Sequence, residues 1–235
     1  MKTRKFLFSA ILMFLSITSL RAQTADEIIN KHLDAIGGKE AWKKVNSIIF
    51  TGSIMVQGME ISVVATFVHQ KGTRQDISMG GMSGYSILTP TEGWSFMPFG
   101  GQQKPEALTP DQVKNGQDQL DIQGELIDYK AKGHVAEYLG KEDVEGTECF
   151  KVKLTLKSGV IKTLFFDPST YYQIREVQKT TSDGKEVEST VNYSNFQKLP
   201  EGIVVPMSIG TPGGDVTFKK IEVNTKIDDS IFKKS

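Results

Sequence analysis

Three strand signals in one short stretch, residues 144–179, constrain the fold of this chain most. From Phe150 to Lys157 apolar and polar residues alternate, so one face of the segment is apolar and the other is polar. The Ser158-Gly159 pair and the DPST sequence at 167–170 then reverse the chain twice, and a further strand signal follows each turn. The stretch predicts an antiparallel meander, whose apolar face must be covered by another part of the chain.

The same alternation recurs along most of the chain. Further strand signals occupy residues 47–57, 59–70, 73–79, 84–89, 93–98, 134–140, 185–193, 203–209 and 216–227. Together with the meander they amount to about eleven strands at the spacing of an all-β protein. A sheet with so many strands cannot stay open and flat. We therefore expect a mainly β (α+β) domain over residues 23–235: one highly curved antiparallel sheet, an unclosed half-barrel, with helices covering its concave face.

Only two regions of the chain show helical signals. Thr24 and Glu27 form a capping box ahead of an apolar run with helical spacing, and Gly37-Gly38 ends that run. A second short helix is predicted at residues 39–45. Another helical region begins at Thr109, which is followed by proline at the first helical position, and is predicted to extend to about Lys130, with a break at Gly116 or Gly124 as an alternative. The last tail of the chain, residues 227–232, ends in Ile and Phe, and we expect it to dock back onto the sheet.

The N-terminal 22 residues predict a secretory signal peptide. Lys2, Arg4 and Lys5 precede the apolar run 6–17, and Ala22 is a small residue suited to cleavage near that point. The apolar run is too short to span a membrane. Because these residues hold four basic and no acidic side chains, and the whole chain has 28 of each kind, the remainder has a net charge of about −4. That charge argues against nucleic acid or an anionic membrane as the main partner.

The sequence shows no set of side chains that would make it an enzyme. His32, His69 and His134 lie in different predicted elements, without Cys, Asp or Glu at metal-ligand spacing. The glycine cluster around Ser83 lacks the arrangement of a phosphate loop or a nucleophile elbow, and predicts a hairpin tip. Cys149 is the single cysteine, so no intramolecular disulfide can form, and we expect it to pack as a small core residue. We therefore expect no catalytic residues, no metal and no cofactor; a hydrolase is the least favoured alternative.

Five segments of the chain, in this order and spacing, resemble a known family. They are residues 35–38 (AIGG), 93–100 (GWSFMPFG), 126–133 (LIDYKAKG), 166–170 (FDPST) and 193–206 (YSNFQKLPEGIVVP). They are similar to the periplasmic LolA-like lipoprotein carriers, in the wider group of outer-membrane lipoprotein-sorting proteins, and most to the Bacteroidetes-type members. The resemblance implies a periplasmic half-barrel whose concave face and helical lid enclose an apolar cavity for acyl chains. It also implies, as partners, a lipid or acylated lipoprotein and lipoprotein-transfer proteins of the inner or outer membrane.

One feature of that family is missing from the sequence. The classical carriers have an Arg-Pro pair near the end of the second or third strand, where the arginine holds the lid. Here the corresponding region reads His69-Gln-Lys-Gly72, and Arg74 follows at a different position.

The leading hypothesis is thus a carrier for a lipid or for lipidated protein, and it predicts an apolar cavity. Several strands have apolar residues on both faces, and methionines, whose side chains are flexible, are concentrated in the first half. The predicted cavity wall consists of Phe50, Ile54, Val63, Phe67, Trp94, Phe96, Phe150, Val152 and Leu154, with Leu120 and Leu126 on the lid. The alternative is a non-catalytic interaction module of the cell envelope with the same fold and a filled core. In either case we expect a monomer that binds no nucleic acid.

Overall fold

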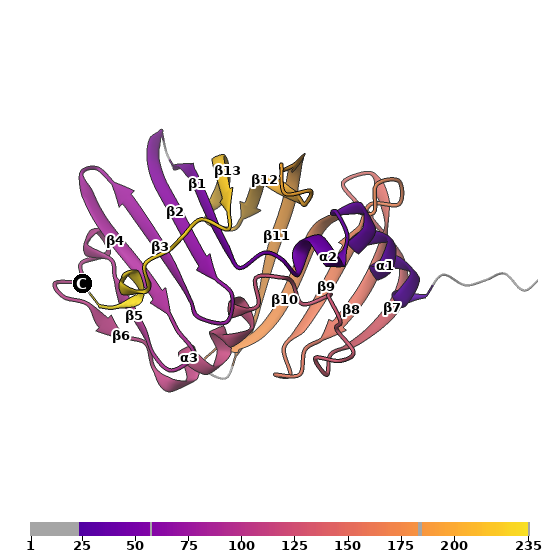
Figure 1. The fold of residues 1–235 in the computed structure, drawn as a ribbon, viewed down its shortest axis with the longest axis horizontal. Helices are drawn as coiled ribbons and strands as arrows, with labels where there is room; N and C mark the ends of the chain where they lie inside the picture. Colours follow the sequence, from indigo (N-terminus) through magenta and orange to yellow (C-terminus); the bar gives the residue numbers. More distant parts are fainter. Residues whose placement is uncertain (1–23, 57, 183–184, 235) are drawn as a thin grey trace, which may run out of the picture.

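The computed structural model describes residues 24–56, 58–182 and 185–234, so the predicted signal peptide lies outside the described residues. Within these ranges, thirteen strands form one antiparallel sheet that does not close into a barrel (Figure 1). This confirms the mainly β fold class. The strands are β1 (Ser47–Val56), β2 (Met59–Val68), β3 (Gly72–Met79), β4 (Met82–Leu88), β5 (Gly93–Phe96), β6 (Glu106–Ala107), β7 (Val135–Val144), β8 (Thr147–Thr155), β9 (Ile161–Phe166), β10 (Gln173–Ser182), β11 (Lys185–Lys198), β12 (Val204–Thr211) and β13 (Gly214–Val223).

The order of the strands determines how the rest of the chain crosses the sheet. That order is β6-β5-β4-β3-β2-β1-β13-β12-β11-β10-β9-β8-β7, so β6 and β7 form the two edges although they are consecutive in sequence. Residues 108–134, which we call the crossing segment, must therefore pass from one edge to the other. They hold the helix α3 (Pro110–Gly116), the 3₁₀ turn η2 (Gln117–Leu120) and a series of turns.

The crossing segment contains less helix than predicted. The helix begins as expected, with Thr109 accepting a hydrogen bond from the backbone of Gln112, and it ends at Gly116, one of the two glycines where a break was expected; the residues from there to Lys130 form a 3₁₀ turn and other turns, not further α-helix. Glycine is a poor helix former, and Gly124 has a φ of +101°, which an α-helix cannot contain. The second predicted helix is also shorter, α2 (Lys39–Trp42). The first helix, α1 (Ala25–Ala35), has the predicted capping box between Thr24 and Glu27.

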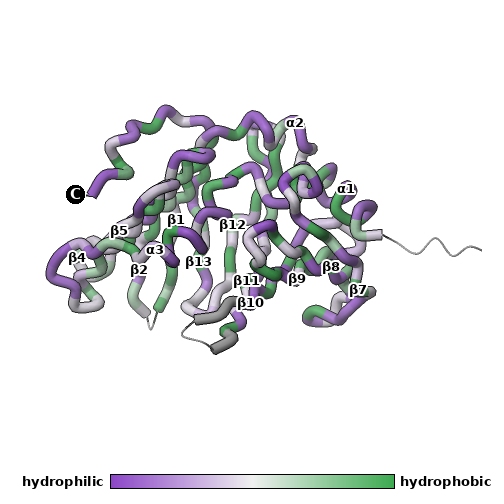
Figure 2. Tube along the Cα trace, turned by 90° about the horizontal axis from the view of Figure 1, so that it is seen from below, coloured by the Kyte–Doolittle hydropathy of each residue, from purple (hydrophilic) through white to green (hydrophobic). Residues whose placement is uncertain are grey.

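The strand register divides the residues of the sheet between two faces. Residues paired across adjacent strands point to the same side. Ile48 pairs with Phe67, Phe67 with Thr73, and Thr73 with Leu88, so these four share one face. We call it the helix face, because α1, α2 and the crossing segment pack on it; the opposite side is the tail face. Figure 2 shows hydrophobic and hydrophilic residues following one another along the strands, as this two-sided arrangement requires.

The main core lies on the helix face beneath α1. Ile28, Ile29 and Leu33 of α1 pack on strand residues of β8 and β9 such as Leu164 and Phe166, all of them buried. A second cluster joins Val45 and Ile203 to the beginning of β1, the beginning of β12 and the end of β13. In a third cluster, Val113 and Leu120 of the crossing segment pack on Leu88.

The C-terminal tail covers part of the tail face, as predicted. Figure 1 shows this yellow segment passing across β2 and β3 toward β5. It ends in the 3₁₀ turn η3 (Asp229–Phe232), where Phe232 packs against Tyr85 and Ile87. Arg74 holds the tail in place. Its guanidinium group forms an ion pair with Asp76 at 2.8 Å and donates a hydrogen bond of 2.8 Å to the carbonyl oxygen of Ile231. Arg74 thus contacts the tail and not the crossing segment.

Candidate functional site

The predicted wall residues of the second half of the chain lie in a filled core. Phe150, Val152 and Leu154 of β8 are on the helix face, and Leu126 of the crossing segment packs with them. All four are buried by α1 and the crossing segment. A ligand could reach them only if one of those covers moved away.

The predicted residues of the first half, apart from those of β5, also lie on the helix face. Phe50 and Phe67 pack in the cluster with Val45, their rings 5.9 Å apart at 89°. Leu120 sits in the separate cluster with Leu88 and Val113. Ile54 and Val63 lie further along the same face, toward the hairpin tips. The structure therefore brings these residues onto one side of the sheet, in several groups.

Trp94 and Phe96 differ from the prediction, because they lie on the tail face. Trp94 pairs with Ile87 and Phe96 with Tyr85, and both pack with the C-terminal tail. They cannot share a wall with Phe50. Alternation within a four-residue strand does not reveal which of its faces matches the neighbouring strand, and a shift of one residue reverses the assignment.

A belt of apolar side chains crosses the helix face near the hairpin tips. Its rows follow the register: Phe218 pairs with Gly52, Gly52 with Val63, and Val63 with Ile77, while Ile54 pairs with both Val216 and Ile61. Met97 and Phe99 extend the belt over Gly84, where an added Cβ would lie 3.1 Å from the Met97 Sδ and from the Phe99 ring. We define the apolar belt as Ile54, Ile61, Val63, Ile77, Met97, Phe99, Val216 and Phe218.

The apolar belt is only partly covered. Ile54, Ile61, Ile77, Met97, Phe99 and Val216 are all partly exposed, whereas Val63 and Phe218 are buried. None of the eight belongs to the core clusters that the helices form in the described part of the chain. Sequence reasoning identified Ile54 and Val63 but missed the other six. The alternation of side chains along β2 and β3 could have identified Ile61 and Ile77. Met97 and Phe99 lie in an irregular turn, where no such alternation exists.

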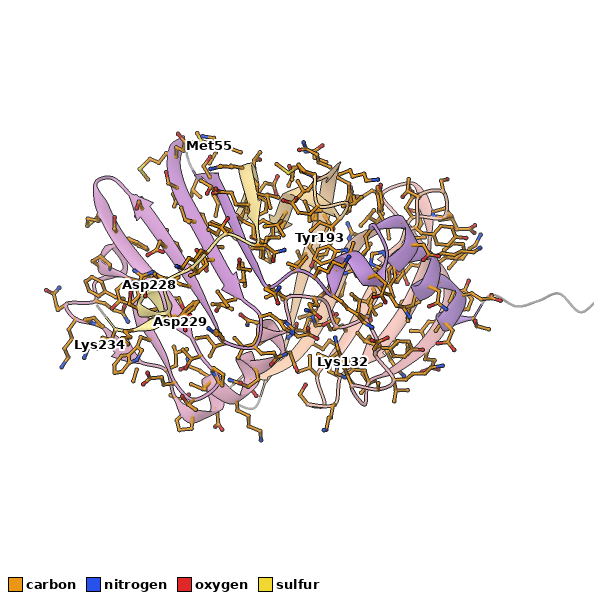
Figure 3. The ribbon with its side chains drawn as sticks, viewed as in Figure 1. Met55, Lys132, Tyr193, Asp228, Asp229 and Lys234 are labelled. Carbon is orange, nitrogen blue, oxygen red and sulfur yellow. The ribbon has the colours of Figure 1, made fainter. Side chains whose placement is uncertain are left out.

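A mostly buried polar cluster lies on the same face, on the β9–β11 side of the belt. The ammonium group of Lys162 is 2.7 Å from a Glu125 carboxylate oxygen and 3.1 Å from one of Glu176. Tyr193, whose partner Ile209 pairs with Val216 of the belt, contacts Glu176. Figure 3 shows Tyr193 near the middle of the sheet.

Burial and charge determine the pKa values in this cluster. Desolvation raises the pKa of Glu125, and the positive charge of Lys162 only partly offsets it. Burial alone would lower the pKa of Lys162, but the two carboxylates outweigh burial and raise it. Desolvation and the same carboxylates raise the pKa of Tyr193. Lys162 is therefore charged at neutral pH, and its ion pair with Glu125 ties the crossing segment to the sheet.

Two further contacts fix the middle of the crossing segment and its internal shape. The backbone N–H of Gln70 donates to the carbonyl oxygen of Leu120 at 2.9 Å, and Lys132 forms an ion pair with Asp121 within the segment itself. Between this segment and the β8–β9 turn there is a polar hollow of about 700 Å³, lined by Asp118, Asp121, Glu125, Lys132 and His134 among others. It opens beside the buried polar cluster.

His69 and His134 both lie near Asp121 of the crossing segment, whereas His32 and Cys149 lie in other parts of the fold. His32 is buried in α1, where its Nδ1 donates to the carbonyl oxygen of Tyr171 at 2.9 Å; His69 lies in the β2–β3 turn and His134 precedes β7. Cys149 is buried on the tail face with Val144 and Phe165, as predicted, and burial raises the pKa of its thiol. In the described ranges, no three His, Cys, Asp or Glu side chains group closely enough to hold a metal ion. The described residues also include no helix of the length and hydrophobicity needed to cross a membrane.

Comparison with known proteins rests on structure. No family model matches the sequence, and no curated protein matches it either. A LolA superfamily protein from Nitrosomonas europaea superposes with a TM-score of 0.54 at 17% identity, covering 91% of this chain and 99% of the other. A DUF1329 family protein from Desulfovibrio piger gives 0.55 at 11% identity, covering 90% and 98%.

A third structure carries a name linked to lipoprotein sorting. It is an outer membrane lipoprotein-sorting protein domain from Vibrio parahaemolyticus, with a TM-score of 0.50 at 12% identity, covering 88% of this chain and 94% of the other. At these identities the likeness is one of fold. This chain therefore shares its overall fold with these three structures, one of which is a LolA superfamily protein.

Proposed function

We propose that this protein is a periplasmic carrier that binds the acyl chains of a lipid or of a lipidated protein on its helix face. The apolar belt is the observation that supports the proposal most. Soluble proteins rarely leave contiguous apolar side chains accessible on a concave sheet unless a ligand or partner covers them. Here six of the eight belt residues are partly exposed, and helices fill the neighbouring parts of the same face.

The belt has the chemistry expected for acyl chains. Its members are aliphatic, aromatic or thioether side chains, so they offer dispersion contacts without hydrogen-bond partners that would demand a particular shape. Met97 adds an adaptable side chain, and Met79 and Met82 lie beyond the belt at the β3–β4 tip. Phe50, Phe67 and Leu120 would extend the contact surface toward the crossing segment.

A longer ligand would need more room than the belt alone supplies. Phe150, Val152, Leu154 and Leu126 would then contact it after the crossing segment has moved, because the segment and α1 cover them now. In this proposal the protein acts as a monomer, receives its ligand from one membrane-bound transfer protein and passes it to another, and carries out no catalysis.

Binding of a fluorescent fatty acid tests the proposal. We would titrate the protein with cis-parinaric acid and compare Ile61→Gln, in the belt, with Ile174→Gln, a half-buried isoleucine on the tail face. An amide in the belt must lose water when the acyl chain covers it, so Ile61→Gln is expected to raise the Kd about tenfold. Ile174→Gln should leave the Kd within about twofold of the wild type. Equal effects of both variants, or no binding by the wild type, would contradict the proposal.

A further inference from the structure

Four turns at one end of the sheet contain no charged residue. They are the β1–β2 turn (55–59, MVQGM), the β3–β4 turn (79–82, MGGM), the turn after β5 (97–101, MPFGG) and the β12–β13 turn (211–214, TPGG). The strand order β5-β4-β3-β2-β1-β13-β12 and the antiparallel pairing place all four at the same end. We call this end the uncharged end. The molecule as a whole has 24% charged residues, and the charges that flank these turns include Lys104, later in the β5–β6 connection, Asp215, directly after the β12–β13 turn, and Lys185 at the start of β11.

The turns at the opposite end of the same strands differ. The β2–β3 turn contains Lys71, the β4–β5 turn Glu92, the β11–β12 turn Glu201, and the segment after β13 Lys226. Each turn there has at least one charge, which is typical of loops exposed to water. The contrast holds for the turns between β5 and β12, whereas the neighbouring β10–β11 connection (182–185, SDGK) has charged residues in its sequence.

Methionines project from the uncharged end. Met55 is 62% exposed, Met59 52% and Met82 46%, which makes them three of the large apolar side chains most exposed in the described structure. Figure 3 shows Met55 at the outer end of the β1–β2 hairpin, directed away from the body of the molecule. The hairpins are in contact, because an added Cβ on Gly214 would lie 3.0 Å from Ile54 and 4.0 Å from Val56. Because β2 also pairs with β3, the hairpins that carry Met55, Met59 and Met82 are neighbours in one surface.

Charged residues border this surface, and two of them neutralise each other; Asp215, directly after the β12–β13 turn, is a third and is exposed. Glu60, which follows Met59, forms an ion pair of 2.7 Å with Lys219. The pair lies on exposed strand positions behind the tips, where it can remain in water while the tips enter a less polar region. The uncharged end is also continuous with the apolar belt through Ile54, Met79 and Met97.

We propose that the uncharged end docks onto the surface of an electrically neutral lipid bilayer, with the methionines of the β1–β2 and β3–β4 hairpins inserted at the headgroup level. Flexible apolar side chains on turns without charge can leave water there without the cost of burying an ion. The net negative charge expected for the processed chain does not favour an anionic surface, so contact with the bilayer depends on apolar burial. The proposal does not rest on ligand binding by the belt.

Co-flotation with phosphatidylcholine vesicles tests the docking. The processed protein, with its N-terminus verified by mass spectrometry, would be compared with Met59→Glu/Met82→Glu. The matched control is Val135→Glu/Ile161→Glu, at positions 64% and 42% exposed on β7 and β9, away from these turns. Both double variants replace two exposed apolar side chains with two negative charges. Thermal unfolding of each variant would show that it is folded.

We expect the Met59→Glu/Met82→Glu variant to partition onto vesicles at least tenfold less than the wild type. The Val135→Glu/Ile161→Glu control should differ from the wild type by less than twofold. Binding of the wild type should persist at high salt, because no ion pair with the lipid contributes to it. Failure of the wild type to bind, or an equal loss in both variants, would overturn the proposal; the first result would indicate a protein partner for this end. Parinaric acid binding would be measured in parallel. A protein that binds parinaric acid but not vesicles would contradict the docking proposal and leave the carrier proposal standing.

Discussion

At the scale of single residues, His32 makes the stability of the protein depend on pH. Its ring is buried beside Phe166, with ring centroids 5.0 Å apart, and desolvation lowers its pKa from 6.5 to about 4. A histidine whose pKa is lower in the folded than in the unfolded state binds its proton less readily when folded. Between pH 6.5 and about 4 the unfolded state therefore takes up more protons, and the protein loses stability as the pH falls.

The expected loss in the free energy of unfolding over that interval is about 3 kcal/mol, because a difference of one between the folded and unfolded pKa values corresponds to roughly 1.4 kcal/mol. Urea unfolding at several pH values between 4 and 7.5 would measure it. His32→Phe keeps the ring but cannot be protonated, so the difference in stability between wild type and variant should shrink as the pH falls. A difference that is constant with pH would show that His32 does not carry this dependence.

Trp94 is a second residue with a specific expectation. It packs on the tail face with Ile87 and Phe232, and the ammonium group of Lys234 lies 4.7 Å from its ring centroid. Trp94→Ala should lower the free energy of unfolding by about 2 kcal/mol, because it removes a half-buried aromatic contact with the tail. The Kd for parinaric acid should not change. A weaker Kd with unchanged stability would place Trp94 in the binding site after all.

At the scale of elements, the Lys162 cluster determines how firmly the crossing segment is attached. Lys162→Met would leave the Glu125 and Glu176 carboxylates, both mostly buried, without a counter-charge, and should cost about 3 kcal/mol of stability. Glu125→Gln leaves Lys162 paired with Glu176 and should cost about 1 kcal/mol.

Urea unfolding at pH 7 of both single variants and the double variant measures these costs, and hydrogen exchange of residues 117–133 reports whether the segment loosens. The double variant should cost less than the two single costs combined, because it no longer contains two unneutralised carboxylates. A Glu125→Gln cost equal to or above that of Lys162→Met would contradict this role of the cluster.

The elements also show what the sequence could and could not predict. The alternation in β8, the capping box of α1 and the turn at Asp167 are local patterns, and the structure confirms them. The two-residue strand β6 is too short to produce a pattern. The predicted face of β5 was wrong because the turn at residues 89–92 interrupts the alternation of side chains between the two faces of the sheet.

The polar cluster could not be predicted for a different reason. Glu125, Lys162 and Glu176 are far apart in sequence, and only the strand order and the path of the crossing segment bring them together. The same holds for the belt, where β13 lies beside β1 although the rest of the sheet pairs strands that are consecutive. Local periodicity carries no information about such contacts.

At the scale of the whole molecule, an unclosed sheet needs cover on both faces, and this chain covers them unequally. The helix face is filled beneath α1 and partly exposed along the belt, while the tail covers β3–β5 on the other side. If the belt is a binding site, the filled half gives the molecule stability and the partly covered half gives it function.

Native mass spectrometry of the processed protein, purified without detergent from a host that exports it, tests this division between stability and function most directly. Lipid extraction of the same sample would identify any bound species. We expect a mass above that of the polypeptide by one phospholipid or acylated peptide, and a reduced occupancy in Ile61→Gln. A polypeptide mass alone, together with no response to parinaric acid, would contradict the carrier function and would indicate an interaction module whose belt is covered by a protein partner.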